Sequence, residues 1–343
     1  MDANELFQKV VDTVQVAGGN GGILQPEQAN RFIDYMWNAT VLGQTVRQIR
    51  MNAPQREIDK MDLGRRIARH ATEGVDDSVN ATPTFSKILL TTEKIRLDWE
   101  LTRESLEDNI AQQGLEDHIA RLMATQLGND LEDLAINGDT STSPSDEGYA
   151  LLKTFDGYHA RATDGGREVD AEGEVISSDL FSRAYRAMPR KFIVRRGQLR
   201  FWASTGLVHD YYKYLSKFPE GDRIGFVDRG RGYEVGGEGG ATGIAPFGIP
   251  LWEIPLQEEE DTSAGTAVDP HDPDGTVATD GQSYFELTHP DNRLWGVKRE
   301  VEVYREFKPK KDAIEYTVYT RQGVQIDNLD AYVTVKDVGL RKV

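Results

Sequence analysis

The side chains that could support metal or acid–base chemistry are scattered along the chain. The six histidines stand at positions 70, 118, 159, 209, 271 and 289, and none belongs to a metal motif such as H-E-x-x-H. His118 falls within a helical pattern, where an isolated histidine is more often a packing or surface residue than a ligand. The chain has no cysteine, which excludes disulfides, thiolate nucleophiles and cysteine-type zinc sites, and a reducing compartment fits.

Two loop-like stretches come closer to a binding motif, and both fail in detail. The stretch 272–275 suggests a calcium loop, but the first ligand position falls on Pro270 and the position of the bidentate acid on Gly281. The glycines between 236 and 243 do not follow a strand and open a helix, as a dinucleotide site requires, and Pro246 follows soon after. We therefore predict no catalytic, cofactor-binding or metal-binding residue, and we expect that the protein is not an enzyme.

Length and charge restrict the class of protein further. The 343 residues suffice for about two domains of ~150 residues each. No apolar run approaches the ~20 residues that span a bilayer, and no secretory signal opens the chain. The formal net charge of −17 argues against tight, extensive nucleic-acid binding, which needs a basic surface. If the protein assembles, it does so through shape and local charge pairing.

The most informative stretch is a strand followed by a long helix. From Lys94 to Leu101, apolar residues alternate with charged ones, which is typical of a half-buried strand. The period then becomes helical, and Asn137 with Gly138 is a strong C-terminal stop. We predict one amphipathic helix from Leu115 to Ile136, roughly 33 Å long at 1.5 Å per residue. Its predicted core stripe is Leu115, Ile119, Leu122, Met123, Leu127, Leu131 and Leu134.

The stretch from Pro54 to Pro83 carries too few apolar residues, set among charges, to build a core of its own. Long stretches of this kind are either functional or disordered. We interpret it as an arm that finds its partners on another subunit, with a floppy surface loop as the alternative. The candidate contacts between subunits are Ile58, Met61, Leu63, Arg65, Arg66 and Arg69.

The remaining patterns alternate between helices and strands. Helices are predicted over 1–17, from about 25 to 37, over 179–188 and over 207–218; strands over 199–203, 249–254, 295–307, 313–321 and 331–336; and loops over 140–174, 230–248 and 257–281. Pro189 ends the third helix, and Pro250 suits an edge strand. The predicted fold class is α+β.

Three phrases carry a resemblance to a known family. They are the run Leu101–Asp108, the run Leu115–Ala120 and the run Ala135–Asp139, and they resemble the spine-helix region of tailed-phage major capsid proteins with the Hong Kong-97 fold. The phrase Asn328–Val333 is similar to the closing strand of that family. The resemblance covers nearly the whole chain and consists of structural elements in the right order.

The resemblance implies an N-terminal arm, an extended loop across a neighbouring subunit, a peripheral domain with the spine helix, and an axial domain. The implied ranges are 1–50 for the arm, 51–92 for the extended loop, 93–175 with 297–327 for the peripheral domain, and 176–296 with 328–343 for the axial domain. The implied function is a head protein that assembles as pentamers and hexamers into an icosahedral shell around double-stranded DNA. Assembly in the host bacterial cytoplasm is expected, with portal and possible decoration proteins as partners.

The sequence departs from the family prototype in two ways. Only a short helix precedes the arm, so we expect a separate scaffolding protein. Lys60 and Asn328 could be donor and acceptor of a covalent crosslink, but no motif supports either, and we predict none. Two alternatives stay open: an encapsulin-like nanocompartment shell, which would hold cargo protein instead of DNA, and a soluble enzyme of unknown type.

Overall fold

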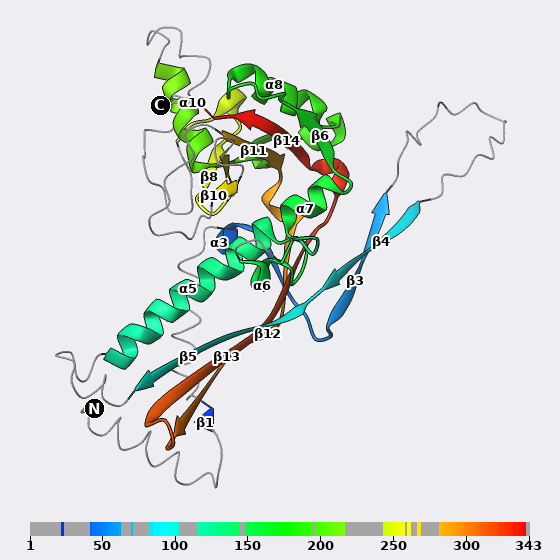
Figure 1. Cartoon of the computed structure of the whole chain (residues 1–343). Coiled ribbons are helices and arrows are strands. Elements are labelled where there is room, and N and C mark those ends of the chain that lie inside the picture. Colours follow the sequence, from blue (N-terminus) through cyan, green and yellow to red (C-terminus); the bar gives the residue numbers. More distant parts are fainter. Residues whose placement is uncertain are drawn as a thin grey trace, which may run out of the picture.

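The computed structural model describes residues 22–23, 42–62, 70, 83–102, 115–144, 148–194, 196–216, 243–257, 259–261, 266–268 and 281–340. They form two sheets, a long helix beside the first sheet, and a projecting two-stranded ribbon (Figure 1). The predicted helices over 1–17 and 25–37 lie outside the described residues. The predicted α+β class is confirmed.

The first sheet has five strands and is built on a long hairpin. Its strands are β1 (Gly22–Ile23), β2 (Arg47–Arg50), β5 (Glu93–Thr102), β12 (Arg293–Lys308) and β13 (Ala313–Ile326). β12 and β13 pair antiparallel, β5 pairs with the other side of β13, and β1 and β2 both pair with β12. The alternation in β5 places Ile95, Leu97 and Trp99 on the face that packs against the core. The strands predicted over 94–101, 295–307 and 313–321 are therefore confirmed.

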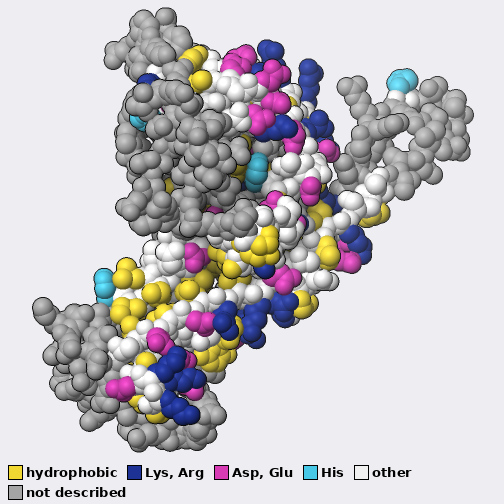
Figure 2. Space-filling model, in the orientation of Figure 1, with side chains coloured by type: hydrophobic (Ala, Val, Ile, Leu, Met, Phe, Trp, Pro, Cys, Tyr) yellow, Lys and Arg dark blue, Asp and Glu magenta, His cyan; other side chains and the backbone are white. Residues whose placement is uncertain are grey.

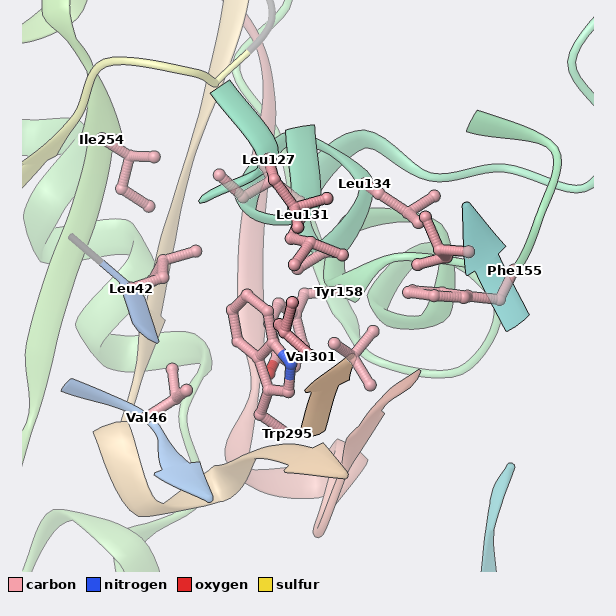
Figure 3. Packing of buried hydrophobic residues seen from close by; sticks show 14 of the residues in the cluster. Leu42, Val46, Leu127, Leu131, Leu134, Phe155, Tyr158, Ile254, Trp295 and Val301 are labelled. Carbon is pink, nitrogen blue, oxygen red and sulfur yellow. The ribbon is translucent and has the colours of Figure 1, made fainter. Parts of the chain in front are cut away.

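The long helix α5 (Leu115–Asn137) packs against this sheet. Leu127, Leu131 and Leu134 are buried beside Trp295 and Val301 of β12, whereas Leu42 of the short helix α3 (Leu42–Thr45) approaches from another side (Figure 3). The helix ends at Asn137, within one residue of the predicted end, and the amide of Gly138 makes the last helical hydrogen bond, to the carbonyl of Leu134 at 3.1 Å. A Cβ at position 138 would collide with the carbonyl oxygens of Leu134 and Phe155, so glycine is required there.

For one residue of the predicted core stripe, Leu122, the predicted burial is wrong in the single chain. Leu122 is 54% exposed, and the buried face near it is formed instead by Ala124, with Met123 partly buried. Ile119 is half-buried, and the side chain of Leu115 is outside the described set. Leu122 and Met123 are neighbours separated by about 100° around the helix, so they cannot both face a flat sheet.

The second sheet has seven strands around β11 (Gly281–Thr288). β11 pairs with β14 (Val333–Gly339), β7 (Arg200–Ser204) and β9 (Glu259–Asp261); β6 (Arg167–Asp170), β8 (Leu251–Ile254) and β10 (Thr266–Val268) complete the sheet. The helices α8 (Ser178–Ala187) and α10 (Thr205–Ser216) pack on it. Phe181 of α8 contacts the rings of Phe201, Tyr211 and Phe285 with centroid separations of 4.8–4.9 Å.

The second sheet confirms the predicted strands over 199–203, 249–254 and 331–336 and both predicted helices, and it also contains strands that the sequence did not indicate. The central strand β11 was not predicted, and the stretch 257–281, expected to be a loop, contains β9 and β10. β6 pairs in parallel with β14, so residues 167–170 belong to this sheet although they were placed in the peripheral domain. Likewise β12 of the first sheet begins at Arg293, before the predicted boundary at 297. The division into named domains stays a prediction.

The remaining helices are short. They are α6 (Tyr149–Leu152), α7 (Tyr158–Thr163) and α9 (Arg190–Ile193), together with 3-10 turns at 196–198, 246–248, 290–292 and 329–331. α7 lies where the two cores meet, because Tyr158 and Ala162 are buried in the first core while the helix also contacts β6 and β14 of the second sheet.

Candidate assembly surfaces

The stretch predicted as an arm forms a two-stranded antiparallel ribbon that projects from the body (Figure 1). β3 (Gln55–Asp62) pairs with β4 (Thr84–Thr91) over eight residues, from Gln55 opposite Thr91 to Asp62 opposite Thr84. Neither strand continues another sheet. The two strands therefore pair only with each other, and each keeps one edge outside the pairing.

The two faces of the ribbon differ, because residues that pair across antiparallel strands place their side chains on the same face. On one face Leu90, opposite Arg56, is fully buried against the body, and Ile58 and Ile88 pair half-buried. The other face carries the pairs Glu57–Leu89, Asp59–Lys87 and Met61–Phe85. We call these six residues the docking face.

The docking face exposes large apolar side chains next to charged ones. Met61 is 66% exposed and its partner Phe85 is 67% exposed, while Leu89 is also exposed. Between them Lys87 donates to Glu57 at 2.5 Å, and this contact raises the pKa of the lysine. In Figure 2 yellow, dark blue and magenta side chains stand side by side on the described part of the ribbon. Paired apolar side chains at this exposure indicate a surface that a partner covers.

The predicted contact residues fall in three places. Met61 belongs to the docking face, whereas Ile58 lies half-buried on the opposite face. Leu63, Arg65, Arg66 and Arg69 lie outside the described residues. Phe85 and Leu89 were missed because the candidate stretch was ended at Pro83, although β-branched and aromatic residues between Thr84 and Thr91 already favoured a strand.

Other large apolar side chains are exposed away from the ribbon. They are Leu122 on α5, Val194 after α9, Tyr212 on α10, Phe307 near the tip of the long hairpin, and Leu329. Phe307 pairs with Ile314, which packs partly buried against the first core. The exposed apolar surface of the chain therefore extends over both sheets as well as the ribbon.

The most concentrated buried charge is structural and joins the two sheets. Arg293 at the start of β12 forms an ion pair with Glu286 of β11, and its guanidinium donates to the Tyr332 hydroxyl at 2.8 Å. Tyr332 in turn donates to Glu286 at 2.6 Å. The guanidinium carbon lies 4.6 Å from the ring centroid of Trp202 and 5.3 Å from that of Tyr158. We call these five residues the arginine cluster.

The electrostatics of the arginine cluster keep both ions charged. Burial alone would raise the pKa of Glu286, but Arg293, His159 and Tyr332 together outweigh it, and the pKa lies below its ordinary value. Burial acts against the charge on Arg293, whereas Tyr332 and Glu286 sustain it, and its pKa is raised. Nδ1 of His159 lies 3.7 Å from Glu286, and the ring stacks on Tyr284. The pair links β11 of the seven-stranded sheet to β12 of the five-stranded sheet, and removal of either partner would leave the other charge buried and unpaired.

The described residues contain no group of three or more histidine, aspartate or glutamate side chains that could hold a metal ion. Within the same part of the chain, no helix has the length and apolar character needed to cross a bilayer. We take the exposed apolar surfaces described above as the candidates for function.

Comparisons with known proteins find similar chains among proteins that assemble with other protein chains, namely capsid proteins. No family model matches the chain. A protein of Bacillus subtilis (strain 168) named as a prophage capsid protein, YqbE, is 30% identical over 287 residues, which cover 83% of this chain and 82% of that protein. Among solved structures, a chain of the satellite phage P4 procapsid superposes with a TM-score of 0.58 at 12% identity, covering 92% of this chain and 99% of that one. A chain of the native GTA particle capsid gives 0.55 at 14% identity, covering 94% of each.

The likeness to solved structures defines the fold as that of phage capsid subunits, the α+β fold of the Hong Kong-97 type. The B. subtilis relative shares enough sequence over enough of the chain to establish the family. The chain belongs to the major capsid proteins of tailed phages. It is accordingly a structural protein of the virion capsid that self-assembles into an icosahedral shell, and its family is not enzymatic.

Proposed function

We propose that the shell consists of pentamers and hexamers of this chain and encloses the double-stranded DNA of a tailed phage. The family supports this proposal. The net charge of −17 supports it as well, because an acidic shell repels the phosphates of the packed genome, so that the DNA does not adhere to the shell. We propose enclosure without sequence-specific binding, which an acidic chain favours. The nanocompartment alternative has no observation in its favour.

In this proposal the five-stranded sheet with α5 is the peripheral domain and the seven-stranded sheet is the axial domain. Boundaries near 167 and 293 follow the sheets more closely than those expected from the sequence. The axial domain surrounds the centre of each pentamer or hexamer. Of the residues 1–50 expected as an arm, those before α3 keep that proposed role, whereas Leu42 and β2 belong to the peripheral core and sheet. Further partners are a separate scaffolding protein, a portal and possible decoration proteins, with assembly in the cytoplasm of the host bacterium.

The ribbon is the part of the chain that reaches a neighbouring subunit. The observation that carries this proposal is the exposure of Met61 and Phe85 as a cross-strand pair on a ribbon with no core behind it. Burial of such a pair is worth about 1.5–3 kcal/mol per side chain when a partner excludes water. The adjacent Glu57 and Lys87 add charge pairing that fixes the register of the contact, as rim charges do in other interfaces.

Substitution of the docking face tests this function. The double variant Met61→Ser/Phe85→Ser should fold as well as the wild type yet fail to form closed shells, which electron microscopy and sedimentation measure. The matched control is Lys60→Ser/Thr84→Ser on the opposite face of the same ribbon. Normal shells from the docking-face variant, or equal failure of the control, would contradict the assigned face.

A native-mass or microscopy measurement tests the wider proposal. The purified wild-type chain, alone or with a scaffold partner, should produce closed particles at high concentration. A compact monomer under every condition would rule the proposal out. Particles filled with a protein cargo instead of DNA would favour the nanocompartment.

A further inference from the structure

The ribbon crosses the five-stranded sheet at a pair of facing glycines. Gly296 of β12 and Gly323 of β13 are directly opposite each other in the register of the long hairpin. The base of the ribbon passes over this pair, where Thr91 and Thr92 lie against Gly323, and Leu90 and Met51 lie against Gly296. We call this point the glycine crossing.

The fit at the glycine crossing leaves no room for a side chain. A Cβ on Gly296 would stand 2.8 Å from the Met51 sulfur and 2.9 Å from a methyl carbon of Leu90. A Cβ on Gly323 would come far closer than 3.0 Å to the carbonyl oxygen of Thr91. The obstacle at Gly296 is thus two flexible side chains, and the obstacle at Gly323 is backbone.

Hydrogen bonds hold the same base to the sheet from several directions. Arg321 donates to the carbonyl of Thr92 at 3.0 Å, and Gln325 donates to that of Leu89 at 2.8 Å. The amide of Met51 donates to Val297 at 2.9 Å. The amide and the hydroxyl of Thr92 both donate to Pro54, which closes the two strands of the ribbon at its base. Among the described residues of the ribbon, these contacts lie at the base, and we take the base to set the direction of the ribbon.

We propose that Gly296 and Gly323 are positioning residues for shell assembly, because their missing side chains set the angle at which the ribbon leaves the body. The inference rests on the proposed role of the ribbon as the element that reaches a neighbour. Eight residues at ~3.3 Å each make a lever of roughly 26 Å. A small tilt at the crossing therefore moves Met61 and Phe85 by several times the displacement at the base. A subunit with a tilted ribbon folds but presents its docking face in the wrong place.

The absence of native cysteine allows the angle to be measured directly. Spin labels on Ser86→Cys in the ribbon and Val194→Cys in the body, both exposed positions, report the distance between them in subunits kept below the assembly concentration. Gly323→Ala should shift this distance distribution and abolish closed shells. Gly197→Ala is the matched control, since a Cβ there meets nothing within 4 Å, and it should leave both readings unchanged.

A second pair of variants separates positioning from general damage. Gly296→Ala should shift the distance less than Gly323→Ala, and adding Met51→Ala together with Leu90→Ala, which removes both obstacles, should restore both the distance and the yield of shells. The same two substitutions should not rescue Gly323→Ala, whose obstacle is the Thr91 backbone. If Gly323→Ala does not fold, Gly296→Ala with and without its compensating substitutions tests the inference by itself.

An unchanged distance in the glycine variants would overturn the inference, whatever happens to the shells. So would a shifted distance with shells of normal yield and size. Failure of the proposed function is distinguishable from both, because the wild-type chain itself would then form no shells while the distance measurement still reported the ribbon angle.

Discussion

The core of the seven-stranded sheet and the ribbon follow opposite principles. In the core, Phe181, Phe201 and Phe285 are fully buried and contact one another. On the ribbon, Met61 and Phe85 are equally apolar but two-thirds exposed. The first group stabilises the folded chain, since burial of each ring on folding is worth about 1.5–3 kcal/mol. The second contributes little until another chain covers it.

The helix α5 shows the same division within a single element. Its C-terminal half is enclosed, with Leu127, Leu131 and Leu134 all buried, whereas Leu122 one turn before them is exposed. The chain therefore buries one group of apolar residues that keep it folded and exposes a second group, which we propose is reserved for neighbouring subunits. Substitutions can test this separation, because equal chemical changes should differ in effect according to the group they fall in.

The largest expected effect is on the buried half of α5. Leu127→Asp should prevent folding, because an unpaired buried carboxylate costs several kcal/mol against a total stability of about 5–15 kcal/mol. Leu122→Asp is the matched control on the same helix, and it should change the free energy of unfolding by no more than about 0.5 kcal/mol. Denaturant unfolding measures both. A soluble, cooperatively melting Leu127→Asp variant would show that the buried face is misassigned.

The arginine cluster should come next. Arg293→Ala should lower the free energy of unfolding by about 3–5 kcal/mol, because it leaves Glu286 charged and buried without a partner. Adding Glu286→Gln should recover part of the loss, since the double variant no longer buries an unpaired charge. Chemical denaturation of the single and double variants gives the comparison. Equal loss in both would mean that the cluster acts through packing rather than through charge.

The acid dependence of stability should show a smaller effect of the same cluster. The pKa of Glu286 is lowered from its ordinary value of 4.5 because the Arg293 charge, with His159 and Tyr332, outweighs burial. A carboxyl whose folded pKa is depressed contributes stability above its unfolded pKa, and this contribution is lost as the pH falls below 4.5 through the folded value. The free energy of unfolding should therefore fall less steeply from pH 6 downward in Glu286→Gln than in the wild type. An identical pH profile in the variant and the wild type would contradict the pairing.

The smallest effect on folding should come from shortening the ribbon. Replacing residues 59–87 by a short Gly/Ser turn joins Ile58 to its cross-strand partner Ile88 and keeps the buried Leu90. The free energy of unfolding should change by less than about 0.5 kcal/mol while closed shells are lost, because the described residues among those removed, 59–61 and 83–87, are mostly exposed. Calorimetry and electron microscopy provide the two readings. Normal shells, or a chain that no longer folds, would each show that the ribbon is not reserved for assembly.

The sequence determined much of the fold through periodicity. Alternation of apolar and charged residues identified β5, β12 and β13, and the helical spacing of Leu127, Leu131 and Leu134 identified α5 and its buried side. The helix ends at Gly138 and Pro189 could also be predicted, since each of these residues acts on its own local backbone. The order of these elements, with the phrases that they carry, was sufficient to indicate the family.

Only the tertiary structure decided which residues meet across long stretches of sequence. Arg293 and Glu286 look like ordinary surface charges in the sequence, and their burial appears only once β11 and β12 meet with Tyr332 beside them. Gly296 and Gly323 belong to strand patterns where glycine looks unfavourable, and the ribbon that requires them comes from residues more than 200 positions earlier. Leu122 and Phe85 carry the same side chains as core residues. Their exposure depends on where the sheet ends and the ribbon projects, which no local pattern encodes.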